Sequence, residues 1–136
     1  DDQRYELAIQ IYKSLVKIAS GSYAKFKLAI AYGLNGDYRQ AIQLLEEVRN
    51  EKPDALVVYN KLAWAHALNG DDHLALSFYN QALAINAYDP FSLFHLGQYY
   101  HIIADRRRAN EYFQRLYSAD KVGDYSARAR KITGGT

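Results

Sequence analysis

The chain contains no cysteine and no methionine among its 136 residues, and only two prolines. Without cysteine it has no disulfide, no thiol nucleophile and no thiolate metal site, so cysteine usage leaves its compartment open. Proline interrupts helix interiors, so its scarcity favours a chain that is helical almost throughout. No apolar run approaches the roughly 18 to 20 residues that a membrane-spanning helix needs. We expect a soluble domain, cytoplasmic or periplasmic, that belongs to a larger protein because the initiator methionine is missing.

Charge and motif content exclude several classes of function. Lysine and arginine total 17 and aspartate and glutamate 15, a net charge too small to indicate a nucleic-acid partner. The four histidines lack the spacing of three or four residues that places two metal ligands on one helix face. Glycine-rich phosphate loops, nucleophile elbows and paired carboxylates are also missing from the sequence. We therefore predict no catalytic residue, no metal and no cofactor, and we expect the protein not to be an enzyme.

A motif recurs along the chain at a fixed interval. The tetrad Leu34-Asn35-Gly36-Asp37 returns as Leu68-Asn69-Gly70-Asp71, 34 residues later. One leucine and one alanine recur three times at the same interval, as Leu28, Leu62 and Leu96 and as Ala41, Ala75 and Ala109. A period of roughly 20 to 50 residues is typical of stacked repeats. Each period contains two apolar stripes with helical spacing, which in the first repeat predict helices over about 23–34 and 38–50.

The period divides the chain into three full repeats, 22–55, 56–89 and 90–123. Residues 1–21 form a half repeat, with a turn over 1–5 and an amphipathic helix over 4–18, and residues 124–136 form a capping helix and a disordered tail from 133. Gly36 and Gly70 can adopt the left-handed conformation that ends a helix. The third turn has Ala104 instead, and a left-handed alanine costs about 1 kcal/mol. We expect this turn to differ in shape or to be the least stable of the three.

The order of small and large residues resembles that of the tetratricopeptide repeat family. In the first helix of each repeat, a small residue follows the recurrent leucine; these small residues are Ala29, Ala63 and Gly97. The position four residues after that leucine has a large aromatic ring, and the three residues there are Tyr32, His66 and Tyr100. Only the first repeat keeps the terminal proline of the family, Pro53, and the early tryptophan of the family is replaced in all three. The resemblance implies an all-α, right-handed superhelix, a solenoid of about three and a half helix-turn-helix repeats with a concave groove lined by first helices.

By the same resemblance, the faces of the first helices that packing does not use point into the groove. These faces are rich in aromatic residues, and the predicted partner-binding set is Tyr23, Phe26, Ile30, Asn60, Trp64, Phe91, Phe94, Gln98 and His101. Exposed aromatic side chains in an apolar patch are typical of protein-binding surfaces. An aromatic stripe with helical spacing is equally typical of a buried core, and a face covered by the parent protein or a second copy is a third interpretation.

The implied function is a protein-interaction scaffold that holds a peptide or amphipathic helix of another protein in this groove. Chaperone-binding members of the family clamp a carboxyl terminus with cationic and amide side chains. The corresponding places here are Phe26, Ile30, Lys61, Phe91 and His95, so we expect no such clamp. The alternative function is self-assembly within a larger bacterial secretion, pilus or polysaccharide-export protein, in which the same face or the exposed repeat ends join copies.

Arg106, Arg107 and Arg108 form a candidate site for an anionic partner. They lie at a predicted helix start in the last quarter of the chain, where lysine and arginine exceed aspartate and glutamate. Cations at a helix start oppose the helix dipole, which favours an acidic protein surface, a lipid headgroup layer or, less expected at this net charge, nucleic acid. A solvated helix face is the simpler interpretation.

Overall fold

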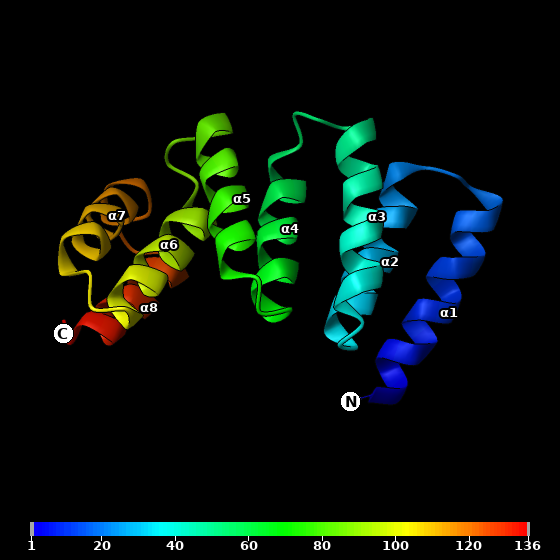
Figure 1. The fold of residues 1–136 in the computed structure, drawn as a ribbon, viewed down its shortest axis with the longest axis horizontal. Coiled ribbons are helices and arrows are strands. Elements are labelled where there is room, and N and C mark those ends of the chain that lie inside the picture. Colours follow the sequence, from blue (N-terminus) through cyan, green and yellow to red (C-terminus); the bar gives the residue numbers. More distant parts are fainter. Residues whose placement is uncertain (1, 136) are drawn as a thin grey trace. The chain divides into compact units, whose positions relative to one another are not determined.

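The computed structural model describes residues 2–135, and over this range the chain is built from helices joined by short connections (Figure 1). The helices are α1 (Asp2–Ile18), α2 (Ser22–Leu34), α3 (Tyr38–Glu51), α4 (Leu56–Leu68), α5 (Asp72–Ile85), α6 (Pro90–Ile102), α7 (Arg106–Ala119) and α8 (Asp124–Thr133). The predicted all-α class is confirmed, and α2 and α3 agree with the predicted helices within about one residue.

The helices belong to two compact units, which we describe separately. The first contains α1 to α4 and the part of α5 up to Phe78; the second contains α5 from Tyr79 onward, α6, α7 and α8. In the first unit α1, α2, α3 and α4 each pack on the next, and α2 also contacts α4. In the second unit α6 packs mainly on α7, and α8 contacts both.

The recurrent leucines and alanines form the core of the first unit. Leu28 and Leu62 are buried, and the small residues Ala29 and Ala63 beside them are fully inaccessible. Small side chains at these places let neighbouring helices approach closely, and each buried leucine contributes roughly 1.5–3 kcal/mol of hydrophobic stabilisation. The predicted turn over residues 1–5 is wrong, because α1 begins at Asp2, whose carboxylate is favourable in a first helical turn; Asp1 lies outside the described residues.

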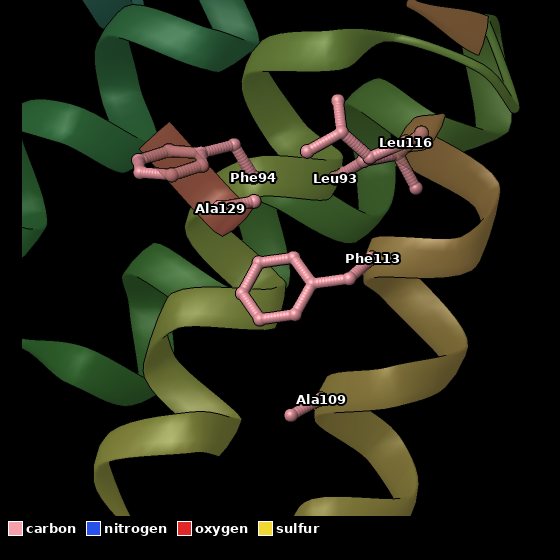
Figure 2. Packing of buried hydrophobic residues seen from close by; sticks show 6 residues of the cluster. All are labelled: Leu93, Phe94, Ala109, Phe113, Leu116 and Ala129. Carbon is pink, nitrogen blue, oxygen red and sulfur yellow. The ribbon is translucent and has the colours of Figure 1, made fainter. Parts of the chain in front are cut away.

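The second unit has its own core between α6, α7 and α8. Figure 2 shows Phe113 pointing from α7 toward α6, with Leu93 and Leu116 above it. A Cβ atom built on Gly97 of α6 would lie 2.5 Å from Cε1 of Phe113, so this position has to be glycine for the ring to pack. On the other side of α6, Ala129 brings α8 against Phe94.

The three turns within the repeats share one backbone conformation. Gly36, Gly70 and Ala104 have φ angles of 87°, 85° and 62°. The amide of the following aspartate donates to a carbonyl of the first helix at 2.9 Å in each turn. The expectation that the third turn differs in shape is therefore wrong, and its lower stability stays a prediction.

The turns differ in their side chains. Asn35 Nδ2 donates to Asp37 at 2.8 Å, and Asn69 Nδ2 donates to Asp71 at 2.9 Å. The bond from Asn69 is the main reason that the pKa of Asp71 is lowered. The third turn has Ile103 at this place, which has no amide to donate. The predicted disorder from residue 133 is wrong at its start, because Thr133 is the last residue of α8 and Gly134 ends the helix in the left-handed conformation; Thr136 lies outside the described residues.

Candidate protein-interaction surface

The outward side of α2 contains three of the predicted groove residues. Tyr23 is 69% exposed, and Phe26 and Ile30 are half-buried. Because helical neighbours on one face are three or four residues apart, these side chains form a single row that includes Lys27 and ends at the exposed Leu34. We call these five residues the α2 face. Lys27 Nζ lies 5.5 Å from the centre of the Tyr23 ring, so the cation is held within the aromatic row.

A pocket of about 320 Å³ opens beside the first half of the α2 face. Its walls are Tyr23 and Phe26 of α2 together with Val57 and Val58 at the start of α4, and Lys52 lies at its rim. Pro53 ends the preceding repeat close to this place, and the turn there brings the start of α4 beside the start of α2. The pocket is apolar with a cationic edge.

A second pocket, of about 350 Å³, lies between α1 and the second half of the α2 face. Tyr5 and Tyr12 of α1 face Ile30 of α2 across it, and Arg4 lies at its edge. Lys27 lines both pockets. The charged side chains that line the two pockets are Arg4, Lys27 and Lys52, all of them basic. The sequence prediction missed Lys27, although its place four residues after Tyr23 is the signal that puts both on one face.

Lys25, by contrast, is neutralised by α3. Its Nζ lies 2.5 Å from Glu51 Oε1 and 3.3 Å from Glu47 Oε2. Glu51 also accepts a hydrogen bond from the Ser22 hydroxyl. These bonds, with Lys25 as the largest contribution, lower the pKa of Glu51, and those from Glu51 and Glu47 raise the pKa of Lys25. The positive charge at the two pockets therefore comes from Arg4, Lys27 and Lys52 rather than from Lys25.

Trp64 of α4 packs on α2. A Cβ atom built on Gly33 would lie 2.4 Å from Cη2 of Trp64, so the indole ring rests on bare glycine backbone. Trp64 is half-buried in this contact, and Lys61 Nζ lies 5.5 Å from its ring centre. Burial lowers the pKa of that lysine. Trp64 therefore packs against α2 and leaves part of its ring exposed to solvent.

Asn60 is buried, so its prediction as an exposed groove residue is wrong. It lies on α4, which contacts α2 and α3. On the same helix His66 stacks on Phe78 of α5, with ring centres 5.4 Å apart. The repeat spacing predicted that Asn60 faces the groove, but the helices packed around α4 enclose its side chain.

Phe94 is also wrong as a groove residue, because it belongs to the core of the second unit. It is 1% exposed and lies beside Ala129 of α8 (Figure 2). Its ring centre is 5.5 Å from that of Tyr125, and the guanidinium carbon of Arg128 lies 4.6 Å from it. Helix α8 therefore covers the face of α6 that the prediction left open.

The other predicted residues of α6 differ in accessibility. Phe91 is half-buried, with its ring centre 4.5 Å from His95 and 6.0 Å from Tyr125. Gln98 is half-buried and His101 is exposed. His101 lines a cleft of about 430 Å³ together with residues of α7 and Thr133.

Within the run of three arginines, Arg106 and Arg108 have different surroundings. Arg106 lines the same cleft as His101. Arg108 Nε instead lies 3.6 Å from Asp105, and its guanidinium lies 5.2 Å from the Tyr100 ring centre. Successive residues on a helix diverge by about 100°, which separates Arg106, Arg107 and Arg108 around α7. The Asp105 side chain also accepts from the Arg108 amide and caps the helix. The anionic-partner site stays a prediction.

Within residues 2–135, no three histidine, aspartate or glutamate side chains gather in a way that would hold a metal ion. Over the same range no helix has the length and apolar character needed to cross a membrane.

Comparison with known proteins agrees with this architecture. Models of the tetratricopeptide repeat match residues 23–55 and 56–89. The structure of TTC0263, a tetratricopeptide repeat protein of Thermus thermophilus, superposes with a TM-score of 0.75 over 97% of this chain and 76% of that chain, at 17% identity. The chain belongs to the tetratricopeptide repeat family. Proteins built from tetratricopeptide repeats are protein-interaction scaffolds, in general without catalytic activity.

Further tetratricopeptide-like structures share the fold. MamA matches with a TM-score of 0.76 and 20% identity over 96% of this chain and 79% of that chain. The first repeat domain of Spaghetti (RPAP3), solved with the HSP90 peptide SRMEEVD, matches with a TM-score of 0.72 and 18% identity over 85% of this chain and 93% of that chain. In sequence, the photosystem I assembly protein Ycf3 of Rippkaea orientalis is 27% identical over 123 residues, covering 84% of this chain and 68% of that protein.

Proposed function

We propose that the protein is a scaffold that binds an apolar, acidic segment of a partner protein along the α2 face of its first unit. The observation that carries the proposal is the row of Tyr23, Phe26 and Ile30 on α2, flanked by two apolar pockets with basic edges. Apolar surface of this kind, bounded by polar groups, is typical of a protein-binding site.

The two pockets define what the segment contains. Each has the volume to accept an aliphatic or aromatic side chain, and Lys27 lies between them. A segment with apolar anchors separated by carboxylates would place its charges near Lys27 and the rim residues Lys52 and Arg4. Such rim charges contribute mainly to the association rate and to specificity, while the buried anchors contribute most of the affinity.

Two relatives support a scaffold role without defining the partner. The Spaghetti (RPAP3) domain holds a short peptide, SRMEEVD, which contains acidic and apolar residues. Ycf3 is an assembly protein. Because Phe26 and Ile30 stand where a carboxylate clamp would have polar groups, we propose that this chain binds an internal segment rather than a free carboxyl terminus. Trp64, Phe91, Gln98 and His101 stay candidate contacts.

The test uses short peptides selected from a random display library against the chain, with binding then measured by fluorescence anisotropy. We expect the selected peptides to combine apolar and acidic residues. The Tyr23→Ala/Phe26→Ala variant should weaken binding by about tenfold or more, as expected for loss of anchoring contacts. Tyr88→Ala is the matched control, because Tyr88 is also a largely exposed tyrosine, at 59%, and lies in the second unit.

A charge variant separates the two contributions. Lys27→Glu should slow association and reduce the dependence of binding on salt concentration, because the central one of the three cations is lost while Arg4 and Lys52 remain. Enrichment of basic peptides, or equal binding by the wild type and the Tyr23→Ala/Phe26→Ala variant, would contradict the proposal.

A further inference from the structure

The second unit has a cleft of about 430 Å³ along α7 that the proposed function does not use. Its floor is apolar, because it contains the buried Ala109 and Phe113 of α7, which point toward α6 (Figure 2). Along α7 the lining runs from Arg106 to Tyr117, eleven residues or about 16 Å of helix. Thr133, the last residue of α8, also lines it. We call this the α7 cleft.

The polar lining of the α7 cleft is specific to the third repeat. Three exposed members replace small or apolar residues that are buried or half-buried two periods earlier: His101, Arg106 and Asn110 stand in the places of Gly33, Tyr38 and Ile42. Thr133 likewise replaces the fully inaccessible Ala65. An apolar helix packed on the α7 cleft would enclose these polar groups at a cost in free energy, whereas a ligand with polar groups of its own can pair with them.

The charges around the α7 cleft favour an anionic ligand. Its lining contains Arg106 and, among the described residues, no carboxylate. Asp105 is next to Arg106 in sequence, but its carboxylate lies 3.6 Å from Arg108 Nε. Glu111 is exposed and lies four residues after Arg107, so these two opposite charges are neighbours on another side of α7. The charge that faces the cleft is therefore that of Arg106.

Two side-chain amides of the α7 cleft suit an extended peptide. Asn110 and Gln114 are four residues apart, so they follow each other along α7 with a rise of about 6 Å. In an extended chain the N–H and C=O of one residue point to the same side, and every second residue repeats this direction after about 6.6 Å. A side-chain amide has both a donor and an acceptor. Asn110 and Gln114 can therefore pair with two alternate residues of one extended chain.

We propose that the α7 cleft binds an extended, acidic segment of a partner protein, about five residues long. Asn110 and Gln114 hold the backbone of the segment, one of its carboxylates pairs with Arg106, and an apolar side chain rests on Phe113. Five extended residues span about 16 Å, which is the length of the cleft along α7. The cleft lies in the second unit and shares no residue with the α2 face, so this inference does not depend on the proposed function.

Capped peptides provide the first test. Acetylated and amidated hexapeptides, which have no terminal charge, are selected from a random pool against the Tyr23→Ala/Phe26→Ala variant, in which the α2 face is disabled. We expect the selected peptides to be rich in aspartate and glutamate. Fluorescence anisotropy of a labelled selected peptide should show about tenfold weaker binding when Arg106→Gln is added to that variant, because a charge-assisted hydrogen bond is lost.

Arg107→Gln is the matched control for the charge. It removes the same charge from the next residue, which is exposed and outside the lining of the cleft. Binding should stay within about twofold, because salt screens a charge at that distance. Circular dichroism should show equal helix content in all of these proteins.

N-methylated peptides test the extended geometry. A methyl group on a peptide nitrogen removes its N–H donor. Methylation should weaken binding by about fivefold to tenfold at two nitrogens that are two residues apart, and by less at the nitrogen between them. On Asn110→Ala, one of these two methylations should have no further effect, because the hydrogen bond that it removes is already missing.

Three results would overturn the proposal. They are selected peptides that are not acidic, equal losses of binding in Arg106→Gln and Arg107→Gln, and a methylation penalty without alternation, as a helical segment would give. Binding at the α2 face is measured separately, by comparing the wild type with Tyr23→Ala/Phe26→Ala. Failure of the proposed function and failure of this inference are therefore distinguishable.

Discussion

Phe26 of α2 and Phe94 of α6 hold the same place in the repeat, two periods apart, in opposite surroundings. Phe26 lines an open pocket in the first unit. Phe94 lies in the core of the second unit beneath Tyr125 and Arg128 of α8. The repeat register decides which side of a helix a residue is on. Whether that side can bind a partner depends on the helix that packs against it.

The largest expected effect comes from truncating these two rings. Phe94→Ala should lower the free energy of unfolding of the second unit by about 3–5 kcal/mol, because it leaves a cavity under α8. Phe26→Ala should cost the first unit about 1 kcal/mol, since its ring is only half-buried. Urea denaturation followed by circular dichroism measures both, analysed with two transitions if the units unfold separately. If both variants lost the same free energy of unfolding, the Phe26 ring would not be the more exposed of the two, and the comparison would fail.

Much of this fold could be predicted because it depends on local signals. Recurrent leucines and small residues mark the helix–helix contacts, and glycine marks the turns, so the helices of the first repeat were predicted within about a residue. The placement of Tyr23, Phe26 and Ile30 along one side of α2 follows from spacing alone.

Contacts outside the period could not be predicted in this way. The sequence indicated a capping helix after residue 123, but not that its Tyr125 and Arg128 lie over Phe94. Trp64 rests on Gly33, and the equivalent places in the other repeats are Ala67 and His101, which have side chains. This contact belongs to one repeat only, so comparing repeats does not find it.

The closed second unit should also be the more sensitive to alkali. Tyr79 is buried there, stacked on His95 with ring centres 5.4 Å apart, and burial raises its pKa well above the usual value. The unfolded chain releases this proton near pH 10 while the folded chain keeps it, so stability falls as pH rises above about 10, by up to about 1.4 kcal/mol per pH unit.

Urea denaturation at pH 9 and pH 11 measures this effect, and Tyr79→Phe is the comparison, because it keeps the ring and removes the proton. The variant should lose less stability than the wild type between the two pH values. The same loss in both proteins would mean that another group controls the alkaline response.

The smallest expected effect concerns the turns that follow α4 in the first unit and α6 in the second. Gly70 and Ala104 have the same left-handed conformation, and a Cβ atom at Gly70 meets no other atom within 4 Å. Exchange of the two residue types therefore tests backbone strain without a steric clash. Ala104→Gly should raise the free energy of unfolding by about 0.5–1 kcal/mol, and Gly70→Ala should lower it by about 1 kcal/mol. Thermal denaturation of the two variants measures the difference, and destabilisation by Ala104→Gly would show that the alanine turn is not strained.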